Sequence, residues 1–293
     1  MPRMNGLETL KLIMKDSPRP VIMVSSLTRE GADTTLEALD CGAFDCLPKQ
    51  SSYASLDIVK MREDLVSKIR AAAESKRPRA RRISPTSIPQ VCVHSFQVTP
   101  SVVALGTSTG GPKALQQILP MFPEDLPVPV LIVQHMPVGF TGPFAKRLNN
   151  LCKVSVREAV AEELLEPGNV YIAPAGNQMT VNRKSPSQVE IRLANTPSDT
   201  PHIPSVDVMM NSVAIVYRGL ALGVIMTGMG ADGALGMEAI RNAGGVTVGQ
   251  DEASCTVYGM SRACAEMGIL RRVVPLEQIP AQVLQAVGYR GKR

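Results

Sequence analysis

The sequence predicts an α/β protein whose main unit is a doubly wound parallel β-sheet. Short apolar runs alternate with longer amphipathic segments along nearly the whole chain. The apolar runs are continuous instead of alternating with polar residues, as expected for parallel strands that helices cover on both faces. Hydrophobic residues make up 44% of the 293 residues and aromatic residues only 3%, so we expect a mainly aliphatic core.

Residues 1–73 are predicted to form a first, small unit. Its helices are indicated by apolar residues at helical spacing, and its strands by short apolar runs that glycine or proline delimits. The expected elements are, in order, a helix over Leu7–Met14, a strand over Pro20–Ser25, a helix over Thr34–Leu39, a strand over Ala43–Leu47 and a helix over Ile58–Ala73. Helix and strand therefore alternate here too.

Residues 74–98 interrupt this alternation. Basic residues crowd together there without a hydrophobic period, and prolines and serines follow; the basic residues are Lys76, Arg77, Arg79, Arg81 and Arg82. Such a composition is typical of an interdomain linker. A nucleic-acid-binding patch is the alternative, but no aromatic residues are interleaved and no helix-turn-helix pattern is present. We therefore expect a linker and no nucleic-acid partner.

The alternation resumes in residues 99–293, the second predicted unit. Strands are expected at Val102–Leu105, Val128–Gln134, Val154–Arg157, Leu222–Met226 and Val246–Gly249. Helices are expected at Lys113–Met121, Phe140–Leu151, Val206–Tyr217, Ala234–Ala243, 259–267 and 277–287. A strand-rich insert is expected to contribute Val170–Ala173, Met179–Val181 and Val189–Arg192. The regular order of strand and helix predicts the parallel sheet in this unit.

Composition excludes several classes of protein. No apolar run approaches the roughly 20 residues that span a bilayer, so no membrane insertion is expected. The N-terminus has no apolar signal core, which predicts a cytoplasmic protein. The six cysteines include no Cys-x-x-Cys pair and show no nearby histidine ligands, so we expect neither a metal site nor a disulfide framework.

Three polar residues follow the carboxyl ends of predicted parallel strands, where open α/β sheets place their ligands. Ser108 lies in a Gly-x-Ser-x-Gly turn between a strand and a helix, and flanking glycines let such a turn expose the hydroxyl. His135 ends an apolar strand, and Asp232 lies in a glycine-rich turn before a helix. A hydroxyl nucleophile needs a base, and the base needs an acid that fixes its tautomer. The three residue types suit these roles.

Each of these residues also has a purely structural interpretation, as a helix cap, a strand-end histidine or an Asp-Gly turn. Other residues compete for the same roles. His202, in a proline-rich loop, is a second candidate base, whereas His94 lies in the linker and is a poor one. Asp207 and Asp251 are further candidates for the orienting acid.

A second function is suggested by the turn Gly228-x-Gly230-x-x-Gly233. It follows a strand and opens a helix, and Asp251 stands about one βα unit further on, as in a dinucleotide-binding fingerprint. This pattern favours a nicotinamide- or flavin-dependent oxidoreductase. Against it, the motif lies late in the unit, and the carboxylate of Asp232 inside the turn would repel a pyrophosphate.

The second unit resembles the CheB family, the bacterial chemotaxis protein-glutamate methylesterases. The matching segments, which together cover essentially 101–285 in family order, are Gly106–Pro112, Val133–Met136, Pro174–Gly176, Pro204–Asp207, Met226–Ala234, Gln250–Cys255 and Tyr258–Met260. The resemblance implies that Ser108 is the nucleophile, His135 the base and Asp232 the orienting acid. It also implies that Thr109 and Met229 border the oxyanion site.

The first unit resembles the second half of a response-regulator receiver domain, which has a flavodoxin-like fold. The segments that match are Met1–Leu7, Val24–Ser26 and Leu47–Lys49. The resemblance gives Ser25 and Lys49 the roles of the hydroxyl and the amine that contact the phosphoryl group. Gln50 departs from the family, which usually has proline there. The phosphoacceptor Asp and the acidic metal-binding pair are expected upstream of Met1, so this chain is expected to lack them.

The CheB resemblance implies an enzyme that hydrolyses glutamyl methyl esters on chemotaxis receptors and deamidates receptor glutamines. The implied partners are methylated chemotaxis receptors and, for an intact receiver, a histidine kinase. No cofactor or metal is implied.

Overall fold

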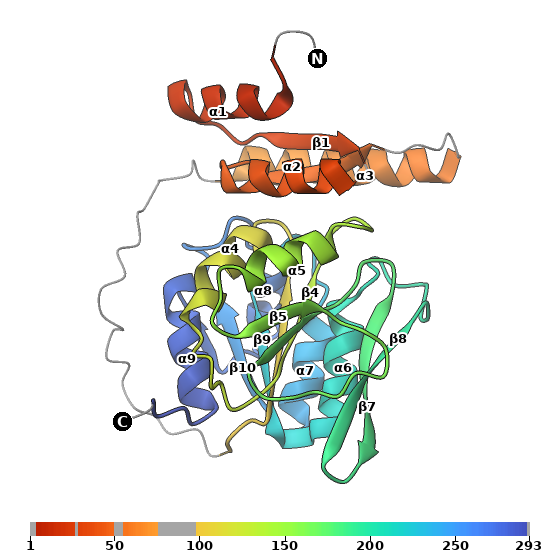
Figure 1. Ribbon diagram of the computed structural model, residues 1–293, viewed down its shortest axis with the longest axis vertical. Helices are drawn as coiled ribbons and strands as arrows, with labels where there is room; N and C mark the ends of the chain where they lie inside the picture. The colour runs from red at the N-terminus through yellow and green to blue at the C-terminus, as the bar shows by residue number, and fades with distance from the viewer. Residues whose placement is uncertain (1–3, 27–28, 50–54, 76–97, 292–293) are drawn as a thin grey trace.

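The computed structural model describes residues 4–26, 29–49, 55–75 and 98–291, in which a small N-terminal unit lies against a larger one (Figure 1). Most of the predicted linker, including His94, falls outside the described residues. The boundaries expected for the two units, 1–73 and 99–293, therefore stay predictions.

The N-terminal unit contains the alternating helices and strands that its sequence pattern predicts. They are α1 (Gly6–Asp16), β1 (Ile22–Ser26), α2 (Arg29–Asp40), β2 (Asp45–Lys49) and α3 (Ser55–Glu74). Asn5 starts α1 with a capping box, because its side chain accepts from the N–H of Glu8 and the carboxylate of Glu8 accepts from the N–H of Asn5. The two strands pair in parallel, and Ser26 lies opposite Lys49 at their carboxyl ends.

The larger unit is built on a seven-stranded sheet in which every pairing is parallel. Its strands are β3 (Val102–Thr107), β4 (Val130–Gln134), β5 (Ser155–Glu158), β6 (Asn169–Ile172), β9 (Ala221–Ile225), β10 (Val246–Gln250) and β11 (Arg272–Val274). Their order across the sheet is β11-β10-β9-β3-β4-β6-β5. The central strands β3, β4 and β9 are buried along their whole length, which explains their unbroken apolar sequences.

Helices cover both faces of this sheet, so the doubly wound prediction is confirmed. The helices are α4 (Gly111–Ile118), α5 (Thr141–Asn149), α6 (Val206–Tyr217), α7 (Ala234–Asn242), α8 (Met260–Glu266) and α9 (Ile279–Ala286). Two apolar clusters form the core. One contains the buried side chains of α4, α5 and α9, and the other contains those of α6, α7 and α8.

The structure differs from the sequence-based expectation at two strands, β6 and β11. The expected insert is only partly an insert, because β6 pairs with β4 and β5 inside the main sheet. Only β7 (Gln178–Ser185) and β8 (Gln188–Ala194) leave it, as an antiparallel hairpin that packs on α6. The edge strand β11 was not expected: it has three residues and begins with a charged one, so it carries no readable apolar run.

The chain order of the strands creates a switch point at the centre of the sheet. After β3 the chain moves to β4 on one side, and it later returns to β9 on the other side. Open α/β sheets bind their ligands outside the carboxyl ends of the strands at such a point. Ser108, His135 and Asp232 follow these three strands in turn, so the fold gathers all three at one place.

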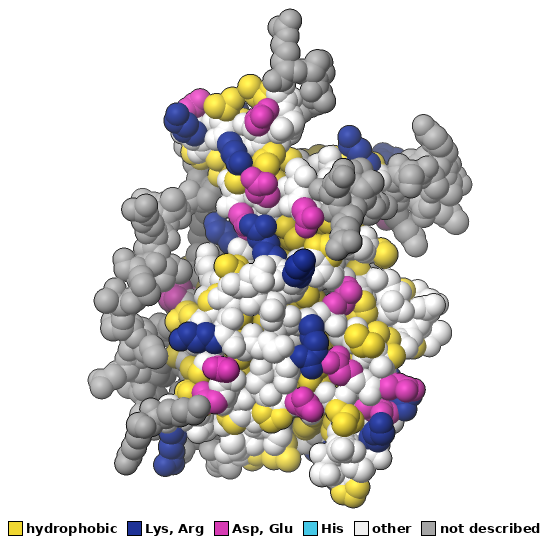
Figure 2. Space-filling view, viewed as in Figure 1, with side chains coloured by type: hydrophobic (Ala, Val, Ile, Leu, Met, Phe, Trp, Pro, Cys, Tyr) yellow, Lys and Arg dark blue, Asp and Glu magenta, His cyan; other side chains and the backbone are white. Residues whose placement is uncertain are grey.

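The N-terminal unit contacts this end of the larger unit through α2, which packs on α4 and α5. Leu36 and Leu39 of α2 are buried in the apolar cluster that also contains Leu115 and Phe144. Asp40, at the end of α2, accepts a hydrogen bond from Gln116 Nε2 at 2.8 Å and also pairs with Arg147. On the face shown in Figure 2, acidic and basic side chains are interspersed and do not gather into an extended patch of one sign.

Candidate active site

Ser108 stands at a tight corner that glycines make possible. Its N–H donates to the carbonyl of Thr227 at 3.0 Å, which ties the corner to the loop after β9. Gly110 has φ +80°, and a Cβ there would lie 2.5 Å from the side chain of Thr256. A Cβ on Gly228 would lie 2.9 Å from Cβ of Ser108. The two loops therefore press together so closely around Ser108 that only glycine fits at both points.

His135 occupies the equivalent position on the neighbouring strand. In the β3–β4 ladder Thr107 lies opposite Gln134, and the N–H of His135 then donates to the carbonyl of Thr107 at 3.2 Å. The next residue of each strand is Ser108 on β3 and His135 on β4, so the register sets these two side by side. Because neighbouring strands are about 4.8 Å apart, the two residues occupy adjacent positions at the end of the ladder.

The ring of His135 is held by Asp232. The hydrogen bond between His135 Nε2 and Asp232 Oδ2 is 2.8 Å long, and both side chains are more than nine-tenths buried. The other ring nitrogen, Nδ1, is buried and has no hydrogen-bond partner among the described residues. Nε2 of this imidazole is therefore bonded to a carboxylate, whereas Nδ1 remains available to bond to another group.

Asp232 is itself held at the N-terminus of α6. Its Oδ2 also accepts from the N–H of Val206 at 2.8 Å, and its Oδ1 accepts from the hydroxyl of Ser205 at 2.8 Å and the N–H of Asp207 at 3.1 Å. Burial alone would raise the pKa of Asp232, but the bond with His135 and the N–H groups of α6 lower it overall. The carboxylate is therefore ionised at neutral pH and accepts the hydrogen bond from Nε2 of His135.

The chain matches the family model described as CheB methylesterase over residues 103–283. The chain belongs to the CheB methylesterase family.

Relatives support this membership over nearly the whole chain. A protein-glutamate methylesterase/protein-glutamine glutaminase 2 of Nitratidesulfovibrio vulgaris is 42% identical, with 98% of this chain and 84% of the relative covered. A protein-glutamate methylesterase/protein-glutamine glutaminase of Pyrococcus horikoshii is 44% identical, covering 98% and 78%. The crystal structure of the Thermotoga maritima CheB methylesterase catalytic domain is 34% identical and superposes with a TM-score of 0.62, covering 64% of this chain and 99% of that one. The sequence-based prediction of a methylesterase and glutaminase enzyme of this family is confirmed.

The two competing acids of the CheB-type unit are occupied elsewhere. Asp207 Oδ1 accepts from the N–H of Gly236 at 2.7 Å, and burial and the charge of Asp232 raise the pKa of Asp207 to about 6. Asp251 Oδ1 accepts from the N–H and the hydroxyl of Ser254 at 3.0 and 2.5 Å. Asp232 is the carboxylate that the fold brings to His135.

His202, the second candidate base, lies beside His135. Its ring stacks on that of His135, with centroids 4.0 Å apart and planes inclined by 25°. Burial, together with the smaller effects of the nearby His135 and Lys68, lowers the pKa of His202 to about 4, although Asp232 acts in the opposite direction. His202 is therefore neutral at pH 7 and covers one face of the His135 ring.

The glycine-rich turn that suggested a dinucleotide site has a different role. Gly228 accepts hydrogen bonds from the N–H groups of Gly259 and Met260 and donates to the carbonyl of Val257 at 3.0 Å, so it joins two loops. The ionised Asp232 stands inside the turn. Together with membership of the CheB family, this argues against the oxidoreductase alternative.

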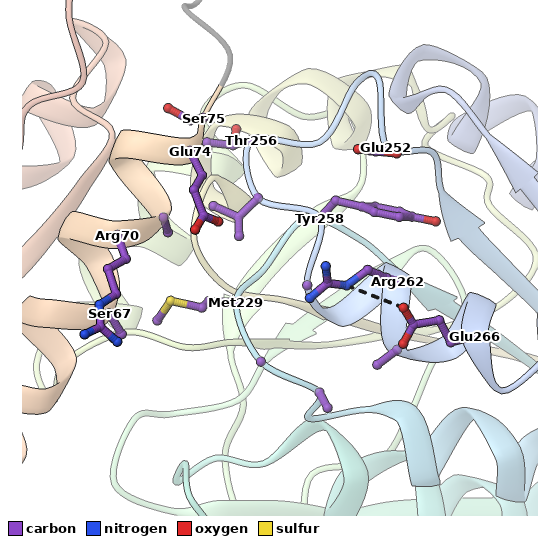
Figure 3. A pocket seen from close by; sticks show the side chains of 16 residues that line it. Ser67, Arg70, Glu74, Ser75, Met229, Glu252, Thr256, Tyr258, Arg262 and Glu266 are labelled. Atoms are coloured by element: carbon purple, nitrogen blue, oxygen red, sulfur yellow. Dashed lines mark ion pairs between the residues drawn. The ribbon is translucent and has the colours of Figure 1, made fainter.

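Thr109 and Met229 lie beneath the N-terminal unit. Thr109 is buried, and its hydroxyl donates to Asp45 Oδ2 of β2 at 2.6 Å. The same carboxylate pairs with Lys68 of α3 at 2.7 Å. Met229 lines a cavity of about 880 Å³ between α3 and the loops of the larger unit, with Arg70, Glu74, Tyr258 and Arg262 around it (Figure 3).

The remaining predictions concern the receiver-like residues, a metal site and a membrane span. Ser25 and Lys49 lie near the carboxyl ends of β1 and β2, and Ser25 Oγ donates to the carbonyl of Gly31 at 3.2 Å. Gln50 falls outside the described residues. In the described part of the chain no three His, Cys, Asp or Glu side chains are grouped so as to hold a metal ion. Among the same residues, no helix combines the length and apolar character of a membrane span.

Proposed function

We propose that the chain hydrolyses glutamyl methyl esters on methyl-accepting chemotaxis receptors, and deamidates receptor glutamines, by means of Ser108, His135 and Asp232. The reaction class rests on the relatives, which are named protein-glutamate methylesterase/protein-glutamine glutaminase. The assignment of roles rests chiefly on one observation. The imidazole of His135 is bonded to Asp232 through Nε2 and has an unpartnered Nδ1 beside the strand position of Ser108.

The tautomer of His135 follows from its partner. Ionised Asp232 can only accept, so His135 carries its proton on Nε2 and has a lone pair on Nδ1. Nδ1 takes the proton of the Ser108 hydroxyl as Oγ attacks the ester carbonyl. The imidazolium that forms is stabilised by Asp232, and its Nδ1 proton then passes to the leaving methoxide, which departs as methanol.

The second half of the reaction reverses these steps. The glutamyl group is esterified to Ser108, and a water molecule gives its proton to Nδ1 of His135 while its oxygen attacks the acyl carbon. Proton return to Ser108 Oγ releases a glutamate side chain. For a receptor glutamine the same sequence applies, with ammonia leaving in place of methanol. Thr109 and Met229 border the position of the developing oxyanion, next to the N-terminus of α4.

We further propose that residues 1–73 are the second half of a receiver domain, with Ser25 and Lys49 at its phosphoryl-facing edge. Two parallel strands that alternate with helices support this, as does the placement of both residues at strand ends. An intact receiver of this kind would be phosphorylated by a histidine kinase. The proposed setting is the cytoplasm, where the receptors present their methylated helices, without a nucleic-acid partner or membrane insertion.

The test is Ser108→Ala, assayed by methanol release from methylated receptor membranes. We expect a loss of at least about 10³-fold in kcat with an unchanged melting temperature, because one hydroxyl is removed at a turn. Ser101→Ala, at the exposed opposite end of β3, is the matched control and should keep full activity. A fluorophosphonate should label Ser108 in the wild type. A folded Ser108→Ala protein with wild-type turnover would contradict the assignment.

A further inference from the structure

Gln134 is the last residue of β4 and precedes the proposed base, His135. Its side chain is 1% exposed, although it is polar and lies at the ligand-binding edge of the sheet. Nε2 of Gln134 donates two hydrogen bonds, to the carbonyl of Ser108 at 3.0 Å and to the carbonyl of His135 at 2.9 Å. One buried amide group therefore bridges the main chains of the proposed nucleophile and the proposed base.

The orientation of this amide is determined by its partners. Both are carbonyl oxygens, which only accept, so the NH₂ group must face them and Oε1 must point away. Oε1 lies beside Gly111, where a Cβ would come within 2.0 Å of it, and it has no hydrogen-bond partner among the described residues. A buried acceptor without a donor is unfavourable. The two hydrogen bonds that Nε2 of Gln134 donates offset this unfavourable burial of Oε1.

The bridge lies just past the end of the regular β3–β4 pairing. That pairing ends where Thr107 lies opposite Gln134, and the N–H of His135 bonds to Thr107 as the last ladder contact. Beyond it the carbonyl of Ser108 turns toward α4 and accepts from the N–H of Gly111 at 2.8 Å. At this point the two main chains begin to diverge, and Gln134 ties them together.

We propose that Gln134 is a positioning residue that sets the separation between Ser108 and His135. This inference rests on the proposed roles of those two residues. Proton transfer from a hydroxyl to an imidazole requires a hydrogen-bond distance, and a misplacement of about 1 Å costs up to about 10²-fold in rate. Without the amide, the carbonyls of Ser108 and His135 would lose their common donor, and both residues would gain freedom to move apart.

The variant that tests this is Gln134→Met, which keeps the length and apolar stem of the side chain and removes its donors. We expect kcat for methanol release to fall about 10- to 100-fold while KM for receptor membranes changes less than about twofold. The rate of Ser108 labelling by a fluorophosphonate should fall by a similar factor, because it reports nucleophile activation without receptor binding.

The matched control is Gln282→Met. Gln282 lies on α9, is also 1% exposed and also has one amide atom without a partner among the described residues. Gln282→Met makes the same substitution at a buried glutamine away from the site. It should leave kcat and the rate of Ser108 labelling within twofold of the wild type. If Gln134→Met is insoluble, Gln134→Asn replaces it. That amide is one methylene shorter and cannot bridge both carbonyls, so the same loss of kcat is expected.

The outcomes separate this inference from the proposed function. An active, folded Ser108→Ala would overturn the nucleophile and the bridge together. An inactive Ser108→Ala with a folded Gln134→Met that keeps its kcat and labelling rate would overturn the positioning role alone. A rise in KM at constant kcat in Gln134→Met would do the same, because it would assign Gln134 to receptor binding.

Discussion

Asp232→Asn tests the tautomer of His135 directly, because it changes the hydrogen-bonding pattern and leaves the size of the side chain unchanged. In the wild type, every partner of this carboxylate donates: Nε2 of His135, the N–H groups of Val206 and Asp207, and the hydroxyl of Ser205. An amide has one accepting oxygen and one donating nitrogen. In either orientation of the amide, its NH₂ group therefore faces at least one donor.

The magnitude follows from the two orientations that the amide can take. With NH₂ toward His135, Nε2 must accept, so the ring proton moves to Nδ1 and the base can no longer deprotonate Ser108. With NH₂ toward Ser205 the productive tautomer survives, but the N–H of Asp207 is unpaired, at a cost of about 1–3 kcal/mol. The first orientation has a similar cost at Val206, so both are populated, and both lose the charge that stabilises the imidazolium.

We therefore expect a loss of about 10²- to 10³-fold in kcat, equivalent to about 2.7–4.1 kcal/mol. This is smaller than the roughly 10⁴-fold loss for the corresponding change in serine proteases. The assay is the initial rate of methanol release at saturating receptor membranes. Asp251→Asn makes the same chemical change on a carboxylate bonded to Ser254 and should be without effect. A loss below threefold for Asp232→Asn would show that Asp232 serves only as a cap for α6.

Three further predictions concern the neighbours of the site. Asp207→Asn should keep its activity within twofold. Burial raises the pKa of Asp207 from 3.8 to about 6, so the folded wild type should lose stability as the pH rises between these values. Urea denaturation of the variant should not show that loss. His202→Phe preserves a ring against His135 and should stay within about threefold of wild-type kcat, whereas His202→Ala should lose more; inactivity of both would make His202 the base. Asp45→Asn should raise the basal rate of methanol release a few-fold by weakening the contact with Thr109, and an unchanged rate would show that this contact does not limit access.

The common location of Ser108, His135 and Asp232 at one edge of the sheet could be predicted because it depends on main-chain features that the sequence displays, whereas the choice of these three over His202, Asp207 and Asp251 rested on the CheB resemblance. The strands β3, β4 and β9 are buried along their whole length, so they appear as continuous apolar runs. Parallel strands end at the same edge of a sheet, which brings Ser108, His135 and Asp232 together without knowledge of any side-chain contact. Glycines at the corners indicated where the chain turns.

What the sequence did not indicate are contacts between side chains that are distant along the chain. The bridge from Gln134 to Ser108 spans 26 residues, and the ring contact between His135 and His202 joins two loops. Hydrophobic periodicity reports which face of an element is buried and says nothing about the partner of a buried amide or imidazole. The strand β11 was missed for the related reason that three residues are too few for any period.

The N-terminal unit contacts the larger unit in two ways: through apolar packing of α2, here called the anchor, and through the hydrogen bond from Thr109 to Asp45, here called the clasp. The anchor is apolar: Leu36 and Leu39 of α2 are buried near α4 and α5, and each buried leucine contributes about 1.5–3 kcal/mol. The clasp is polar: the charged hydrogen bond from Thr109 to Asp45 contributes about 1.5–3 kcal/mol and lies next to Ser108. Because Asp45 lies on β2 and the buried leucines lie on α2, we expect a change at Asp45 to expose the surroundings of Ser108 while α2 stays in place. Asp45→Asn should therefore raise the basal rate without releasing the N-terminal unit, whereas Leu39→Ala should loosen the unit as a whole, a difference that limited proteolysis of α2 would detect.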